Sequence, residues 1–274
     1  MQNTCHYEHC INEQYRLSEQ EWQLLCKKLP IDRRVNKVGR PAICWKSVLN
    51  GVAYVLKTGC QWKALPYCFG APSTIHGRFQ ILVTDGVFMN IWSELLSKYD
   101  AYCGLQLATQ IADCALVKAP LGGENTGINF ADKYKFGSKR SMLTDACGIP
   151  LSIIISSARI HDSKLLEMTI AHKLNTRSHH SQEMQLDAAY DARIIKKMLV
   201  SYGYKPAIAH NRRRSPVKKT YEKLKNRWVV ERSHSWINRF RRLLVRWDKK
   251  AVNHLALIQF ACSIIISSKL PIFG

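Results

Sequence analysis

Residues 107–117 read LATQIADCALV, a short apolar run interrupted by one acid, Asp113. Residues 151–156 read LSIIIS and have the same β-branched, aliphatic character. Runs of this length and composition are typical of buried strands. The turn-forming residues 145–148 precede the second run and predict a hairpin between two strands. The centre of the chain is therefore expected to contain a sheet.

Working outward, the strand-like segment 184–188 contains a second acid, Asp187. It precedes a helix-like stretch at 193–202 and a further strand candidate at 205–209. Strands that alternate with helices indicate a mixed α/β layer structure. We place this domain at residues 101–274.

The preceding region, residues 17–100, shows helical periodicity throughout, after a tail at residues 1–16. Ser18 and Glu21 form a capping-box pattern that predicts a helix start. Further helical patterns begin at 45 and 73, and a third is opened by Asp85-Gly86, with Gly59 expected to cap the first of them. This region is predicted to be a small all-helical domain.

The 274 residues carry 41 Lys and Arg against 20 Asp and Glu, a formal charge of +21. Between residues 205 and 250, 16 basic residues face three acids, so this stretch contributes +13. Isolated basic residues are usually solvated, but so dense an unpaired run favours contact with phosphate. An anionic partner, either nucleic acid or an acidic membrane surface, is expected rather than a neutral metabolite.

Residues 222–247 are predicted to form one long helix, because apolar residues recur there with helical spacing. Trp236 and Trp247 lie on that apolar stripe and are interpreted as packing residues. Glu231 falls on the opposite side as a lone carboxylate near Arg227. The apolar run 255–266 predicts a closing core helix.

Membrane insertion is not expected, since the run 255–266 is far below the roughly 20 residues that a span requires. No secretory signal pattern is present, and the ten cysteines form no CxxC pair, which favours reduced thiols in the cytoplasm. Cys5, His6, His9 and Cys10 are zinc-ligand types, but a loose tail without a downstream partner pair is the preferred interpretation.

A basic surface together with acids in strands suggests metal-dependent phosphodiester chemistry. Mg²⁺ prefers carboxylate oxygens, and two divalent ions can activate the attacking oxygen and stabilise the leaving one. Asp113, Asp187 and Glu231 form a candidate trio. The alternatives are turn residues for the two aspartates and an i,i+4 ion pair with Arg227 for Glu231.

Several long motifs resemble the DDE transposases of bacterial insertion sequences, in the insertion-sequence-five group. They lie in the family's order from about residue 17 to 268 and read GRPAICWKSVLNGVAYVLKTGCQWKALPYCFG, PSTIHGRF, DCALVKAPLGGENTG, FGSKRSMLTDACGIPLSIII, ARIHDSKLLE, RWVVERSHSWINRFRRLLVRWDKK and LALIQFAC. The resemblance implies a ribonuclease-H-like catalytic domain that follows the N-terminal helical DNA-binding domain.

The resemblance also implies roles for individual residues. Asp113, Asp187 and Glu231 match the three catalytic acids that hold Mg²⁺ or Mn²⁺, and Arg227 matches the arginine that precedes the glutamate. The arginines expected to contact DNA are Arg212, Arg213, Arg214, Arg227, Arg232, Arg239, Arg241 and Arg242. The implied function is to bind the element's terminal inverted repeats, cleave DNA and join the freed 3′ end to target DNA. A homo-oligomer, a dimer or larger, is expected on the bacterial nucleoid, with a catalytically decayed DNA-binding protein as the alternative.

This chain departs from the family pattern at four places. Leu224 and Asn238 replace the usual Tyr and Lys around the glutamate, Ala188-Ala189 replaces a basic residue and Gly, and Gly77 replaces an Arg. Three other acids in resembling motifs, Asp145, Asp162 and Asp248, are interpreted as turn, cap or ion-pair residues. His161 is interpreted as a loop histidine and Gly122-Gly123 as a substrate loop, not a phosphate cradle.

Overall fold

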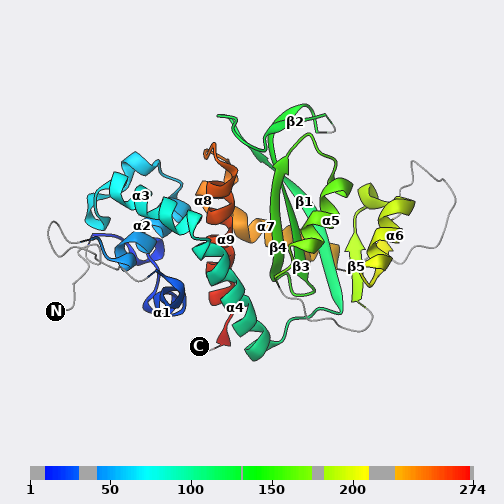
Figure 1. Ribbon diagram of the computed structural model, residues 1–274, viewed down its shortest axis with the longest axis horizontal. Coiled ribbons are helices and arrows are strands. Elements are labelled where there is room, and N and C mark those ends of the chain that lie inside the picture. Colours follow the sequence, from blue (N-terminus) through cyan, green and yellow to red (C-terminus); the bar gives the residue numbers. More distant parts are fainter. Residues whose placement is uncertain (1–9, 31–41, 131, 175–181, 210–225, 272–274) are drawn as a thin grey trace.

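The computed structural model describes residues 10–30, 42–130, 132–174, 182–209 and 226–271. Figure 1 shows helices α1 to α3 at one end of the molecule and the sheet with α5 and α6 at the other, with α4, α8 and α9 between them. One hydrophobic core joins these parts, since α4 and α9 pack together and α2 packs against α8. The N-terminal helices therefore share their core with the C-terminal part of the chain.

The N-terminal helices begin and end where the sequence signals them. Ser18 and Glu21 form the capping box of α1, and Gly59 ends α2 with a left-handed backbone, φ 75°. A side chain at this φ would be strained, which explains why Gly ends the helix. The elements of this region are η2 (Glu13–Tyr15), α1 (Glu19–Leu25), η3 (Cys26–Lys28), α2 (Trp45–Thr58), η4 (Trp62–Ala64), η5 (Tyr67–Phe69), α3 (Pro72–Thr84) and α4 (Val87–Cys103).

The sheet is mixed, and β1 lies at its centre. β1 pairs antiparallel with β3 on one side and parallel with β5 on the other, while β3 also pairs with β2 and β4 and β5 pairs with β6. The mixed α/β interpretation is confirmed. Its strands are β1 (Thr109–Lys118), β2 (Gly127–Asn129), β3 (Lys135–Asp145), β4 (Pro150–Ser157), β5 (Gln182–Leu186) and β6 (Tyr204–Ile208).

Two helices cover opposite faces of the sheet, as alternate side chains of β3 show. Arg140 donates to His234 of α7, whereas the next residue, Ser141, shares a hydrogen bond with Thr169 of α5. Successive residues of a strand point to opposite faces, so α5 and α7 lie on different sides. The helical elements here are α5 (Asp162–Ala171), η6 (Ala188–Tyr190), α6 (Arg193–Ser201), α7 (Arg227–Asn238), α8 (Arg241–Leu244) and α9 (Ala251–Ser267).

The hairpin at 145–148 and the closing core helix are both confirmed. The buried Asp145 carboxylate accepts from the backbone N–H groups of Gln106, Cys147 and Ile149, which is the turn role expected of it. Helix α9 is buried along most of its length. Among the described residues, no helix is long and apolar enough to cross a membrane.

The single helix predicted over 222–247 is wrong where the structure describes it. Helix α7 ends at Asn238, α8 occupies only one turn, and Val245 forms a parallel bridge with Lys118 beside β1. The backbone N–H of Arg246 donates to the carbonyl of Lys118, so pairing with the sheet replaces helical bonding. Trp247 is 43% exposed and is not a core residue.

Candidate active site

Asp113 lies on β1, and Asp187 directly follows the neighbouring strand β5. β1 and β5 run parallel with Thr109 opposite Glu183 and Ile111 opposite Gln185. Continuing this register by two residues places Asp113 level with Asp187, which directly follows β5 and caps η6. Paired residues of parallel strands point to the same face, so both carboxylates lie at the carboxyl edge of β5. The strand-end position expected for Asp187 is confirmed.

Burial and like charge act together on Asp113. Its pKa is raised from 3.8 to about 6, chiefly because the carboxyl is buried, and the charges of Asp187 and Asp162 raise it further. The backbone of Cys114 and the Arg227 guanidinium oppose this rise in the pKa. A buried carboxylate beside others has too little positive charge around it, which favours a cation at this position.

Helix α7 supplies the nearest cation. Arg227, its first residue, lies with Nη2 3.4 Å from Oδ2 of Asp187, and both side chains are partly exposed. Glu231 follows one turn later and is exposed, and among the described residues its carboxylate forms no ion pair or hydrogen bond. The structure thus brings Asp113, Asp187 and Arg227 together, and Glu231, one turn further along α7, does not join them in the described residues.

A buried contact that the sequence did not reveal fixes α7 on the sheet. Nε of Arg140 donates to Nδ1 of His234 at 3.2 Å, and Nη2 donates to Oδ1 of Asn238 at 3.1 Å. Burial and the Arg140 charge lower the pKa of His234 to about 3, and the backbone of Asp113 acts in the opposite direction. Arg140 is donor only, so a neutral His234 accepts at Nδ1 and carries its proton on Nε2.

The same contact explains one departure from the family pattern. An Asn at 238 accepts a hydrogen bond from Arg140, which a Lys at this position could not do. Gly77 lies on α3 with open space where a Cβ would be, so the structure has room for a larger residue there. Leu224 lies outside the described residues, as do Cys5, His6 and His9 of the zinc alternative.

Asp162 and Lys139 form a second polar group near the pair. Lys139 Nζ lies 2.7 Å from Oδ1 of Asp162 and donates to the carbonyl of Ile160 at 2.7 Å. Asp162 is the first residue of α5, and the His161 side chain caps this helix by accepting from the backbone N–H of Ser163. The cap is therefore His161, expected from the sequence only as a loop histidine, whereas Asp162, expected in a turn or cap, follows the cap and forms an ion pair.

The residues at this edge fit a divalent ion held by two carboxylates. The parts of the chain that the structure describes contain no group of three or more His, Cys, Asp and Glu that could hold a metal. Asp113 and Asp187 nevertheless meet the common Mg²⁺ arrangement, in which one or two carboxylates combine with water and substrate phosphate oxygens. Of the three acids predicted to hold the metal, Asp113 and Asp187 are the two that the described structure brings together.

The arginines expected to contact DNA fall into different environments. Arg239 and Arg241 are exposed, whereas Arg242 is buried and pairs with Asp248 at 2.9 Å. The expectation for Arg242 is therefore wrong, because its guanidinium neutralises an internal acid instead of facing solvent. The ion pair expected for Asp248 is confirmed. Arg212, Arg213 and Arg214 lie outside the described residues.

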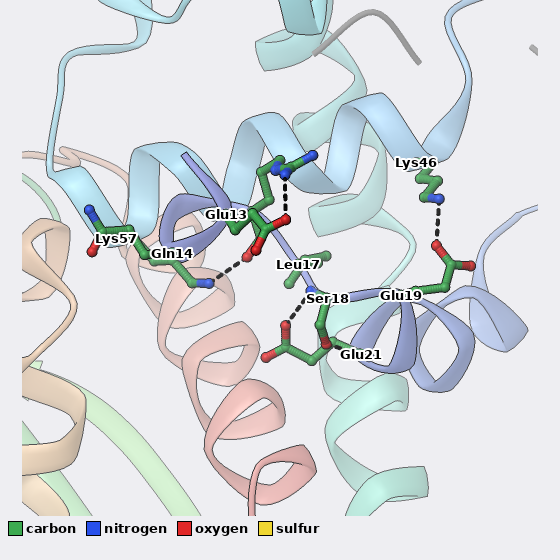
Figure 2. A pocket seen from close by; sticks show the side chains of 9 residues that line it. Glu13, Gln14, Leu17, Ser18, Glu19, Glu21, Lys46 and Lys57 are labelled. Carbon is green, nitrogen blue, oxygen red and sulfur yellow. Dashed lines mark hydrogen bonds and ion pairs between the residues drawn. The ribbon is translucent and has the colours of Figure 1, made fainter. Parts of the chain in front are cut away.

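A separate cavity of about 450 Å³ lies between the N-terminal segment and α2. Figure 2 shows Ser18 paired with Glu21 and Lys46 paired with Glu19 along its wall. Lys57 donates to the carbonyl of Arg16, and burial lowers its pKa. The cavity is at the opposite end of the molecule from β5, so it does not belong to the Asp113–Asp187 site.

Comparison with known proteins agrees with this geometry. Residues 105–266 match the family model described as "Transposase DDE domain", and this region contains Asp113, Asp187 and Glu231. The chain thus belongs to the class of transposases with a DDE domain. Residues 17–92 match the model described as "Putative transposase of IS4/5 family". The chain belongs to the DDE transposases of the IS4/5 family.

Individual relatives are also insertion-element and transposon proteins. The "Putative transposase for insertion sequence element IS402" of Burkholderia cepacia is 35% identical over 150 residues, which cover 53% of this chain and 69% of that protein. A 16.2 kDa protein of the same element is 28% identical over 115 residues, 40% of this chain and 78% of that protein. Two solved structures of Mos1 transposase, a paired-end complex with the left transposon end and a strand transfer complex, each give a TM-score of 0.27. Their identities are 9% and 10%, with coverage of 78% and 88% of this chain and 82% and 83% of the Mos1 chains.

Proposed function

We propose that this transposase binds the terminal inverted repeats of its insertion element and catalyses metal-dependent cleavage and transfer of DNA strands. The observation that supports this most directly is the level placement of Asp113 and Asp187 on neighbouring parallel strands. Asp113 and Asp187 would hold Mg²⁺ or Mn²⁺, which when bound activates the attacking oxygen and stabilises the leaving one. Glu231 would complete the site once DNA is bound.

The chain's own groups position the reactants. At neutral pH Asp113 is mostly ionised, since its pKa is about 6, and is available as a ligand. Arg227 faces Asp187 from the start of α7, where its guanidinium can also contact a DNA phosphate. In the first reaction a water oxygen attacks the phosphorus at the element's end and displaces the 3′-oxygen, and in the second the freed 3′-hydroxyl attacks a target phosphodiester and displaces its 3′-oxygen.

The remaining expectations belong to the same proposal. The sheet topology, in which β1, β3 and β4 are antiparallel neighbours, the short β2 also pairs with β3, and β5 and β6 run parallel to β1, supports a ribonuclease-H-like fold for residues 101–274. Residues 17–100 are proposed to recognise the inverted repeats, and a dimer or larger assembly is proposed to hold two ends together. Action on the nucleoid follows from the DNA substrate and from the basic charge.

The test is incubation of the purified protein with duplex DNA that ends in the element's own repeats. Cleaved and joined strands are expected with Mg²⁺ or Mn²⁺ and not with EDTA. Asp113→Ala is expected to abolish cleavage and to leave DNA binding intact, and full cleavage by this variant would refute the role of Asp113. Cleavage without joining would indicate a nuclease.

One observation favours the alternative of a DNA-binding protein that has lost catalysis. Glu231 does not join the aspartates in the described part of the chain. Salt-sensitive binding to repeat ends, with no products in any divalent metal, would establish that alternative.

A further inference from the structure

One face of α7 carries a stack of alternating aromatic and cationic side chains. Trp228, Arg232 and Trp236 follow one another at intervals of four residues, and Cζ of Arg232 lies 4.6 Å and 4.8 Å from the two indole centroids. Nζ of Lys269, just after α9, lies 4.0 Å from the Trp236 ring. We call these four residues the cation–π ladder.

A groove of about 210 Å³ extends from the ladder between α7 and α9. It adds a third cation, Arg239, which is exposed like Lys269. The lining residues are Trp236, Arg239, Phe240, Ile264, Ile265, Ser268 and Lys269. The groove thus combines an apolar floor with positive charge along its edge.

The three cations of this surface repel one another without neutralisation by acids. Burial lowers the pKa of Lys269, Arg232 and Arg239 lower it further, and only the Cys147 thiol raises it. Among the described residues, none of these three cations forms an ion pair with a carboxylate. Like charges held together in this way are stabilised when an anion binds between them.

Arg232 also has a structural role, but this role does not account for the other residues of the ladder and its groove. Arg232 Nη2 donates to the carbonyl of Cys147 at 2.7 Å and so holds the β3–β4 turn against α7. Lys269 and Arg239 make no such side-chain bond to the turn, and Trp228 is 56% exposed. Fixing the turn requires neither an exposed indole nor two further cations beside it.

We propose that the cation–π ladder and its groove bind the phosphodiester backbone of DNA at a surface separate from the Asp113–Asp187 pair. This inference rests on the proposed function, and it adds a contact surface that acts in binding and not in the chemical step. Stacking between two indoles holds the Arg232 guanidinium in one orientation before DNA arrives, which reduces the entropy lost on contact. Arg239 and Lys269 supply the adjacent phosphate contacts.

The test compares two charge-matched double variants. Arg239→Gln with Lys269→Gln removes two cations of the groove, while Arg193→Gln with Lys197→Gln removes two exposed cations of α6. Affinity for duplex DNA carrying the repeat end is measured by fluorescence anisotropy at several salt concentrations. Each lost phosphate contact lowers the slope of log affinity against log salt by about 0.9, so the groove variant is expected to lose up to about 2.

The groove variant is also expected to bind roughly tenfold or more weakly near 100 mM salt. Lys269→Arg, which keeps the charge, should retain binding. Thermal unfolding of each variant distinguishes lost contacts from lost structure. Trp228→Ala should weaken binding more than Trp228→Phe, which keeps an aromatic ring against Arg232.

Three results would overturn the inference. In the first, the groove variant binds DNA with the same affinity as the α6 variant. In the second, Lys269→Arg lowers the affinity as much as Lys269→Gln. In the third, polyglutamate displaces DNA from the wild type but not from the groove variant, which would indicate that the groove binds an acidic protein. Each of these leaves the proposed function standing, provided that the wild type binds and cleaves repeat-end DNA. A wild type that binds no DNA would instead refute the proposed function itself.

Discussion

The two aspartates and Glu231 are positioned by different kinds of structural element. Asp113 and Asp187 are placed by the register of β1 and β5, which main-chain hydrogen bonds define. Glu231 lies on α7, whose position depends on side-chain contacts such as that between Arg140 and His234. Strand pairing places a carboxylate rigidly, whereas a docked helix leaves room for adjustment, and only the strand-borne acids are already together.

The largest effect on cleavage is expected from substitution of Glu231, because this test decides whether the acid on α7 acts together with the two aspartates. If Glu231 joins on DNA binding, Glu231→Gln should lower the cleavage rate by at least about 100-fold, the equivalent of about 3 kcal/mol. Stability should change by less than about 0.5 kcal/mol, since the side chain is exposed. Single-turnover cleavage of repeat-end DNA measures the first quantity and urea unfolding the second.

A matched control is available one turn away. Ser235→Ala alters a hydroxyl that donates only to the backbone carbonyl of Glu231, so it should leave the cleavage rate within a few-fold. Wild-type cleavage by Glu231→Gln would show that the two aspartates suffice, and the three-acid interpretation would then be wrong.

A substitution at His234 is expected to weaken the attachment of α7 to the sheet. His234→Ala removes a buried ring and leaves Nε of Arg140 without an acceptor. The expected loss of unfolding free energy is about 3 kcal/mol, from the cavity together with an unsatisfied buried charged donor. His234→Asn keeps an acceptor near the position of Nδ1 and should lose less. Equal losses for the two variants would mean that packing, and not the bond to Arg140, holds the helix.

Much of the fold follows from local patterns in the sequence. The capping box at Ser18, the glycine at 59 and the hairpin ending at Gly148 all act over a few residues, and each is found where the sequence predicts it. The position of each aspartate within or at the end of an apolar strand is similarly local, whereas their level placement depends on the pairing of β1 with β5. The local signals do not depend on distant parts of the chain.

The sequence-based predictions fail where contacts between residues distant in the sequence determine the local structure. Strand β3 was not predicted, because its residues 135–141 read KFGSKRS and look exposed. In the fold, Lys139 pairs with Asp162 and Arg140 binds His234, so these polar side chains are buried with partners from α5 and α7. The helix predicted through 247 fails for the same reason, since Arg246 is buried and donates to Ser138 of β3 at 2.6 Å.

Electrostatics of the strand-borne pair gives the third prediction. Because the pKa of Asp113 in the folded protein is about 6, above its ordinary value of 3.8, the folded state binds this proton more tightly than the unfolded state. The stabilisation is complete below pH 3.8 and is lost as the pH rises through 6. At pH 7.5 in EDTA, Asp113→Asn should therefore raise the unfolding free energy by about 1–3 kcal/mol.

The gain should disappear near pH 4, where the wild-type carboxyl is largely protonated. Urea unfolding of both proteins at the two pH values tests this. A gain of equal size at pH 4 would show that the effect comes from the amide's own hydrogen bonds and not from relief of a buried charge.

The smallest effect is expected at the ion pair that links α7 to the aspartates. Arg227 and Asp187 are 36% and 40% exposed and 3.4 Å apart, so solvent screens their attraction. Arg227→Gln should change the unfolding free energy by less than about 1 kcal/mol, in contrast to His234→Ala. A loss as large as that of His234→Ala would mean that α7 is held from its first residue. The position of Glu231 would then depend on the aspartates themselves, and strand pairing and helix docking would not be independent ways of placing the three acids.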